Sequence, residues 1–178
     1  MSFDGRDRPN RIPWPPLIGA AAVVAALAGA RVFPMGVPFA PLARPLGWAL
    51  IAAGLALVLW AIATFRRART NLMPNRGADR LVVDGPFAFT RNPIYLGEAI
   101  LFVGVGGATG SLWFVVAALV MTALIDLLAV RREEVHLALR FGEAWAAYAA
   151  RIPRWIGPRR KPPAPPQAGR GELNRDRG

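Results

Sequence analysis

The chain has no cysteine, one histidine and one lysine among its 178 residues. Without cysteine, it cannot form disulfides, use a thiolate nucleophile or hold zinc through thiolates. The single histidine, His136, argues against a multi-histidine metal site. It forms one Glu-x-x-His spacing with Glu133, whereas a dinuclear metal bundle needs two such motifs and more carboxylates. We therefore predict no metal site.

Acidic residues are also scarce: the chain has 11 of them and 22 basic residues, which gives a formal net charge of +11. Such a charge could serve nucleic-acid binding. However, the chain is 54% hydrophobic, and its apolar residues come in long runs typical of a membrane protein. The arginines flank these runs as membrane topology requires, so we predict no nucleic-acid partner. The alanine, arginine, proline and glycine bias is typical of GC-rich bacterial genomes. Together with the apolar runs, it leads us to expect a protein of the bacterial inner membrane.

Four apolar runs predict an all-α polytopic membrane protein with about four transmembrane helices. The first run has a competing interpretation as a cleaved signal peptide, because Ala28-Gly29-Ala30 resembles a cleavage site. A short glycine-rich turn joins the third and fourth runs, which predicts an antiparallel helical hairpin. The runs are Pro16–Phe33, Leu46–Phe65, Pro93–Ala108 and Leu112–Val130.

Basic residues orient these predicted spans. The segments before the first run, between the second and third, and after the fourth hold 20 of the 22 lysines and arginines. Cytoplasmic loops carry such an excess, so we expect both termini to be cytoplasmic.

The region after the fourth run predicts a helix outside the membrane. From Arg131 to about Ala150, large apolar side chains recur at spacings of three and four and form one helical face. We expect this helix to lie against the cytoplasmic membrane surface or the loops. The face consists of Leu137, Phe141, Trp145, Tyr148 and Ile152.

These boundaries divide the chain into four parts. Residues 1–15 form a polar N-terminus, and residues 16–83 hold the first two spans and a cytoplasmic loop. Residues 84–156 form a core that holds the remaining motifs, and residues 157–178 have the composition of a disordered tail.

A polar turn at the start of the third run is the strongest functional signal. Asn92 and Pro93 favour a helix start, because asparagine is a good N-cap and proline suits the first helical position. A helix N-terminus binds anions, and Arg91 adds a two-pronged donor. The adjacent pair Glu133-Glu134 follows the fourth run. These groups could hold a small zwitterion at the membrane surface. Alternatively, the turn could simply begin the third span, and the carboxylates could be a solvent-exposed charge cluster at the end of the fourth.

The stretch Arg91-Asn92-Pro93-Ile94-Tyr95-Leu96-Gly97, together with Gly85-Pro86-Phe87, Glu133-Glu134, Phe141-Gly142 and Arg151-Ile152-Pro153, resembles a known superfamily. This is the isoprenylcysteine carboxyl methyltransferase and phospholipid methyltransferase superfamily, and the resemblance covers roughly residues 84–156. Its members are integral membrane enzymes that use S-adenosylmethionine. Asn92 stands where the family signature has histidine. Because asparagine cannot act as a base near neutral pH, we expect a binding role for it and assign no catalytic residue.

The resemblance implies a site for S-adenosylmethionine. Arg91 and the helix start would hold the methionyl carboxylate, and Tyr95 would lie near the sulfonium. The carboxylate pair would hold the amino group or the ribose hydroxyls, and the C-terminal helix, with Phe141, Trp145 and Tyr148, would cover the adenine. The implied cofactor-binding residues are Arg91, Asn92, Pro93, Tyr95, Gly97, Glu133, Glu134 and Tyr148.

The resemblance further implies a lipophilic methyl acceptor that enters from the membrane lipids. An isoprenylcysteine-type carboxylate, a phospholipid amine or another amphiphile would fit. Glu98 and Asp126 are acids within the predicted spans; such groups are costly and face a cavity or a partner, so we place them at a substrate pocket. The alternative is a non-enzymatic membrane subunit or a proton-coupled transporter that uses these two acids.

Overall fold

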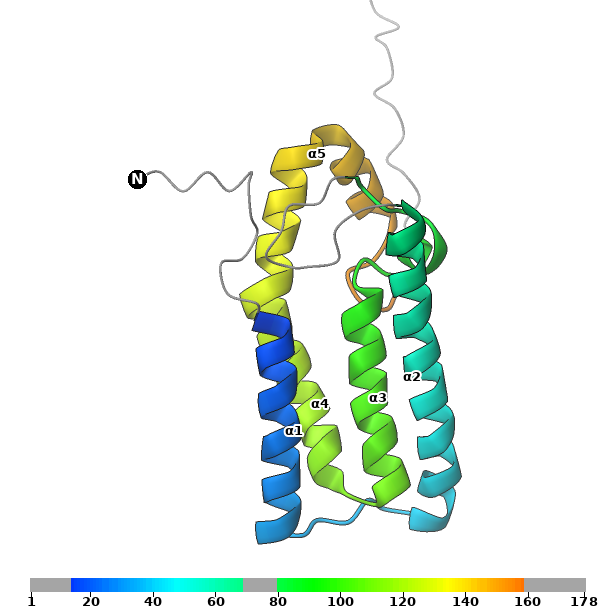
Figure 1. Cartoon of the computed structure of the whole chain (residues 1–178), viewed down its shortest axis with the longest axis vertical. Coiled ribbons are helices and arrows are strands. Elements are labelled where there is room, and N and C mark those ends of the chain that lie inside the picture. Colours follow the sequence, from blue (N-terminus) through cyan, green and yellow to red (C-terminus); the bar gives the residue numbers. More distant parts are fainter. Residues whose placement is uncertain (1–13, 69–79, 159–178) are drawn as a thin grey trace, which may run out of the picture.

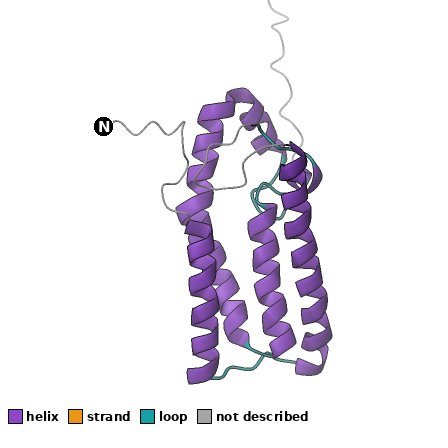
Figure 2. Ribbon diagram, viewed as in Figure 1, coloured by secondary structure: helices purple, strands orange, loops and turns teal. Residues whose placement is uncertain are grey.

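The computed structural model describes residues 14–68 and 80–158, and all regular elements in these ranges are helices (Figure 2). The prediction of an all-α protein is confirmed. The predicted polar N-terminus up to residue 13 and the predicted tail from residue 159 lie outside the described residues. In chain order, the elements in Figure 1 are α1 (Trp14–Val32), α2 (Ala40–Ala68), the short 3-10 helix η1 (Gly85–Ala88), α3 (Pro93–Thr109), α4 (Leu112–Ile125), the π-helical turn η2 (Asp126–Val130) and α5 (Arg131–Arg151).

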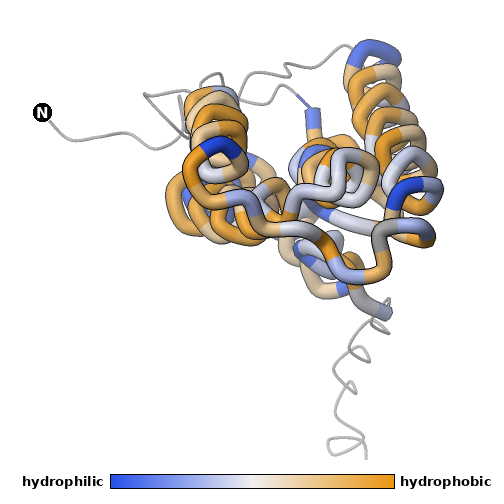
Figure 3. Tube along the Cα trace, turned by 90° about the horizontal axis from the view of Figure 1, so that it is seen from below, coloured by the Kyte–Doolittle hydropathy of each residue, from blue (hydrophilic) through white to orange (hydrophobic). Residues whose placement is uncertain are grey.

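Three helical stretches are long and apolar enough to cross a membrane. They are α1, α2 from Pro41, and the continuous stretch Leu112–Arg151, whereas α3 is a shorter apolar helix of 17 residues. At 1.5 Å per residue, α3 is roughly 25 Å long, and its 17 residues lie at the lower end of the range for transmembrane helices. Viewed along the helices, the turns are mostly apolar in colour (Figure 3). The four predicted runs therefore correspond to α1, α2, α3, and α4 with η2.

The helices α2 and α3 pack backbone to backbone through glycines. Gly47 and Gly54 on α2, and Gly97 and Gly104 on α3, are each spaced by seven residues, which places each pair on one helical face. A Cβ atom added at Gly54 would lie 2.7 Å from the carbonyl oxygen of Gly97. Small residues drive helix association in lipid because they allow this close approach. The glycines therefore fix α3 against α2.

The second helix pair consists of α1 and α4. The helix α4 also packs against α3, so that α1, α4, α3 and α2 follow one another (Figure 1). At the end where α3 meets α4, Trp113 Nε1 donates a hydrogen bond of 2.7 Å to the carbonyl oxygen of Phe33. Near the opposite end, Ile18 of α1 packs in one buried apolar cluster with Met121 and Ile125 of α4.

The helix α5 continues α4 through the π-helical turn η2 and then folds back. Gly142 has a φ of +51° within α5, and after this bend the helix returns toward the start of α3 (Figure 1). Its predicted apolar face is confirmed, since Trp145, Tyr148 and Ile152 are buried beside the segment that holds Leu81 and Val83. The first half of α5 is continuous with α4, whereas the sequence suggested a separate helix outside the membrane. The reason is that no helix-breaking residue lies between α4 and Gly142.

The glycine contact between α2 and α3 predicts opposite outcomes for two alanine substitutions. The Gly54→Ala change puts a methyl group against the backbone of α3 and should lower the free energy of unfolding by about 1–3 kcal/mol. The Gly19→Ala control on α1 meets nothing within 4 Å and should be neutral or slightly stabilising. Thermal unfolding in detergent measures both, and equal midpoints for the two variants would contradict the packing described here.

Candidate functional site

The start of α3 is held by the chain that follows α5. Asn92 occupies the N-cap position and Pro93 begins the helix, as predicted, but the Asn92 side chain makes no capping hydrogen bond. Instead, its Nδ2 donates to the carbonyl oxygen of Arg154 over 3.0 Å. The expectation that Asn92 caps α3 through its side chain is therefore wrong. The physical reason is that a carbonyl group from the distant end of the chain lies within reach of the amide.

Two further hydrogen bonds join the same parts of the chain. We call residues Ile152–Ile156 the C-terminal segment. The buried Thr90 donates through Oγ1 to the carbonyl oxygen of Arg154 over 3.1 Å, and the backbone N–H of Arg91 donates to the carbonyl oxygen of Pro153 over 3.0 Å. The motif at residues 90–92 therefore positions the C-terminal segment over the start of α3.

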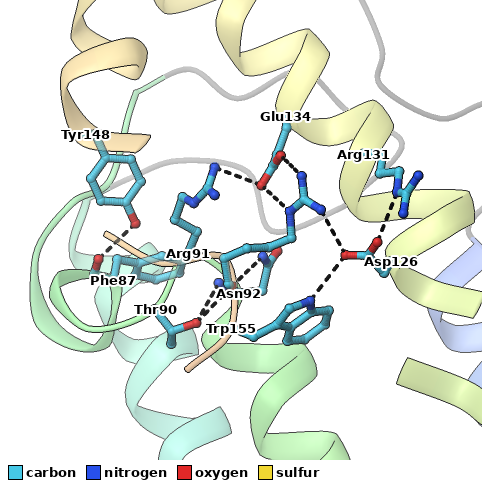
Figure 4. Close-up of polar contacts among 10 residues, drawn as sticks. Phe87, Thr90, Arg91, Asn92, Asp126, Arg131, Glu134, Tyr148 and Trp155 are labelled. Atoms are coloured by element: carbon cyan, nitrogen blue, oxygen red, sulfur yellow. Dashed lines mark hydrogen bonds and ion pairs between the residues drawn. The ribbon is translucent and has the colours of Figure 1, made fainter. Parts of the chain in front are cut away.

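The ion pairs at this junction centre on Glu134. Its Oε1 lies 2.9 Å from Arg91 Nη1, and the side chains of Arg91 and Glu134 are only 15% and 16% exposed (Figure 4). Arg154 grips the same carboxylate at two points, with Nε 2.9 Å from Oε1 and Nη2 2.5 Å from Oε2. The structure thus brings together the arginine and the carboxylate that the sequence placed at two neighbouring helix ends.

A second carboxylate, Asp126, extends this arrangement. It accepts hydrogen bonds from Arg131 Nε at 3.0 Å, from Trp155 Nε1 at 3.2 Å and from Arg154 Nη1 at 3.4 Å (Figure 4). The hydrogen bond with Glu134, together with the charges of both acids, raises the pKa of the Arg154 guanidinium above its usual value. Asp126 is therefore connected to the predicted site through Arg154.

Glu133 takes a different partner from its neighbour. The Tyr95 hydroxyl donates to Glu133 Oε1 over 2.9 Å, while Glu134 pairs with the arginines. Adjacent helical residues point about 100° apart, so the two carboxylates reach different parts of α3 and its surroundings. Both members of the pair therefore face the junction between α3 and α5.

Three predicted site residues of α3 lie outside this network of ion pairs and hydrogen bonds. Pro93 is fully buried at the helix start. Gly97 faces α2, where an added Cβ would lie 2.9 Å from the carbonyl oxygen of Gly54, so close packing accounts for glycine there. Glu98 is half-buried one turn after Tyr95, and its side chain makes no hydrogen bond or ion pair with another described residue. The cofactor role of Gly97 and the substrate role of Glu98 stay predictions.

Two aromatic side chains of the returning half of α5, Trp145 and Tyr148, contact the region around Arg91. The Arg91 guanidinium carbon lies 5.6 Å from the centre of the Trp145 ring, an attractive cation–π distance. The buried Tyr148 donates through its hydroxyl to the carbonyl oxygen of Phe87 over 2.8 Å (Figure 4). Tyr148 thus ties α5 to the turn that precedes Arg91.

Sequence reasoning missed Thr90, Arg154 and Trp155. Arg154 could have been expected from the acids alone. Asp126 and the carboxylate pair lie in or beside a predicted span, where an unpaired acid is costly, so each requires a basic partner. The C-terminal segment supplies an arginine directly after the Arg151-Ile152-Pro153 motif. No local pattern reveals which acid this arginine meets, since the contact joins residues 20 and 28 positions apart.

More than half of the chain, with part of the candidate site, matches a known protein family. The model of a family described as phospholipid methyltransferase matches residues 42–144, which is more than half of the chain. No curated protein and no solved structure matches the chain significantly. The matched region includes most of α2, all of α3 and α4, and the residues Arg91, Glu133 and Glu134, and it ends before Tyr148 and Arg154.

The buried hydrogen bond of Tyr148 predicts a stability effect. The Tyr148→Phe change leaves the carbonyl group of Phe87 without this donor and should cost about 1–3 kcal/mol of stability. The Thr109→Val control removes a hydroxyl that bonds within its own helix at an exposed position, and it should change stability much less. Thermal unfolding with limited proteolysis measures both effects. Unchanged stability in Tyr148→Phe would show that this hydrogen bond does not hold α5 in place.

Proposed function

Because the chain belongs to the phospholipid methyltransferase family, we propose that it transfers a methyl group from S-adenosylmethionine to a lipophilic acceptor at the membrane surface. The observation that carries this proposal is the ion pair between Arg91 and Glu134 at adjoining helix ends. The family membership points to an enzyme, which favours this function over a membrane subunit or a proton-coupled transporter.

The residues at this junction fit the amino-acid end of S-adenosylmethionine. That end carries a carboxylate and an ammonium group, and Arg91 and Glu134 offer the complementary charges 2.9 Å apart. A zwitterion can enter between them and leave neither charge unpaired. Both side chains are largely shielded from water, which strengthens such ionic contacts.

The remaining proposed cofactor residues surround this ion pair. Trp145 lies against Arg91 and offers an aromatic surface for a purine, while Glu133 offers carboxylate oxygens to hydroxyl groups. Tyr95 orients Glu133 through its hydrogen bond. Asn92, Pro93, Gly97 and Tyr148 support the site by fixing the start of α3 and the position of α5.

The chain's contribution to methyl transfer is alignment in a site with little water. When bound, S-adenosylmethionine supplies an activated methyl group on a sulfonium. The described side chains hold and orient the reactants, because a displacement at a methyl carbon gains most from correct placement. The Asn92 amide cannot accept a proton, so we assign no catalytic side chain.

The acceptor reaches this site from the bilayer. Glu98 lies one turn inside α3 from Tyr95 and would meet the head group of an amphiphile, and Asp126 would shape the pocket through Arg154. A carboxylate acceptor of the isoprenylcysteine type needs no proton removal, whereas a phospholipid amine must first be deprotonated. Both belong to the lipophilic class that we propose, together with other amphiphiles and lipidated molecules.

Binding of S-adenosylhomocysteine by detergent-purified protein tests the site. Loss of one charged partner should weaken binding at least about tenfold in Arg91→Ala and in Glu134→Gln, since each leaves one end of the zwitterion without its counter-charge. Isothermal titration calorimetry measures these affinities. The Arg132→Ala control removes an equal charge from an exposed position on α5 and should bind like the wild type.

The same variants then enter a transfer assay. Liposomes that contain phosphatidylethanolamine or a farnesylated cysteine acid receive S-adenosylmethionine labelled in its methyl group. Label should move to the organic phase with wild-type protein and not with Arg91→Ala. Wild-type affinity in both Arg91→Ala and Glu134→Gln would refute the proposed site, and binding without any transfer to these lipids would exclude both of them as acceptors.

A further inference from the structure

Arg154 grips Glu134 differently from Arg91. Two of its nitrogens bond both carboxylate oxygens, at 2.9 and 2.5 Å, whereas one ion-pair contact of 2.9 Å joins Arg91 to Glu134. A two-point contact fixes the plane of a carboxylate as well as its position. Glu134 can therefore lose Arg91 and remain oriented and charge-compensated by Arg154.

The different contacts of Arg91 and Arg154 with Glu134 matter when a charged ligand binds. A zwitterion that enters between Arg91 and Glu134 brings a carboxylate to the arginine and an ammonium group to the glutamate. Every charge then keeps a partner, and Arg154 holds Glu134 in the position that the ammonium group needs. Asp126 lies 3.4 Å from Arg154 Nη1 and steadies the guanidinium from its other side. Without Arg154, Glu134 would be drawn wholly to Arg91, and the ligand would have to separate that pair.

The backbone of Arg154 is held by the motif at the start of α3. Its carbonyl oxygen accepts hydrogen bonds from Thr90 Oγ1 and Asn92 Nδ2, at 3.1 and 3.0 Å. Both donors flank Arg91 in the sequence, so the residues that frame one arginine also place the other. An amide suits this position because Nδ2 donates, whereas a carboxylate there would repel the carbonyl oxygen.

From this geometry we propose that Arg154 is a positioning residue of the cofactor site. It holds Glu134 ready for the ammonium group of an amino-acid ligand, while Arg91 takes the carboxylate, and Asn92 with Thr90 keeps Arg154 in place. The proposal rests on the proposed function, because S-adenosylmethionine is the ligand that brings the amino-acid group.

Two ligands separate this role from a general structural one. S-adenosylhomocysteine carries the amino-acid end, whereas 5′-methylthioadenosine has the same nucleoside and thioether without it. Both are titrated calorimetrically into full-length wild-type protein and Arg154→Ala. The variant should bind S-adenosylhomocysteine about tenfold to a hundredfold more weakly, because the orientation of one charged contact is lost. Its affinity for 5′-methylthioadenosine should stay within about twofold of the wild type.

Two more variants sharpen the test. The Arg154→Lys change keeps the charge but loses the two-point grip, so it should show a smaller loss confined to S-adenosylhomocysteine. It carries the test if Arg154→Ala does not fold. The Asn92→Asp change keeps the size of the side chain and removes the donor, so it should reproduce the selective loss. The Arg132→Ala control should bind both ligands like the wild type.

The outcomes separate this proposal from the proposed function. Equal weakening of both ligands in the Arg154 variants would assign Arg154 a structural role and overturn the proposal. Unchanged binding of S-adenosylhomocysteine in these variants would overturn it as well. If folded wild-type protein binds neither ligand, the proposed function itself fails, and the inference fails with it.

Discussion

The arrangement of the candidate site depends on the carboxylate of Glu134, which joins two arginines from distant parts of the chain. Arg91 comes from the turn before α3, Glu134 from the first turns of α5, and Arg154 from the C-terminal segment. The side chains of Arg91 and Glu134 are largely shielded from water, which strengthens the ionic contact between them. The partial shielding of this pair makes it a strong constraint on how the three segments meet.

The membrane-spanning helices determine where this junction lies. Glycines hold α3 against α2, and α4 packs against α3, so that the start of one helix and the end of another lie at the same level. Charged groups are costly within the hydrocarbon layer, which favours their placement at helix ends. Asp126 and Glu134 meet this constraint through the arginines that surround them. In the function that we propose, the polar cofactor meets the lipophilic acceptor where the apolar helices end.

Much of the fold was predictable because apolar runs and helix-start residues act locally. The run that begins at Pro93 corresponds to α3, and the spacing from Leu137 to Ile152 gave the buried face of α5. The partner of the Asn92 side chain was not predictable, because it is a backbone carbonyl 62 residues away. Capping preference describes a helix end in isolation, and here a tertiary hydrogen bond takes its place.

The candidate site was likewise predictable only in part. Arg91 and Glu134 stood out because each lies beside a predicted span with a charge that a zwitterion needs, and the structure pairs them. Arg154 did not stand out, because its role depends on how the chain returns after the bend at Gly142. Neither hydrophobic periodicity nor charge counting predicts the direction of that return.

A structure of the protein with S-adenosylhomocysteine would show whether this ligand enters between Arg91 and Glu134. We expect the ion pair between Arg91 and Glu134 to open, with the ligand's carboxylate on Arg91, its ammonium group on Glu134, and the contact between Glu134 and Arg154 retained. A ligand bound elsewhere, with the ion pair between Arg91 and Glu134 still closed, would contradict this expectation.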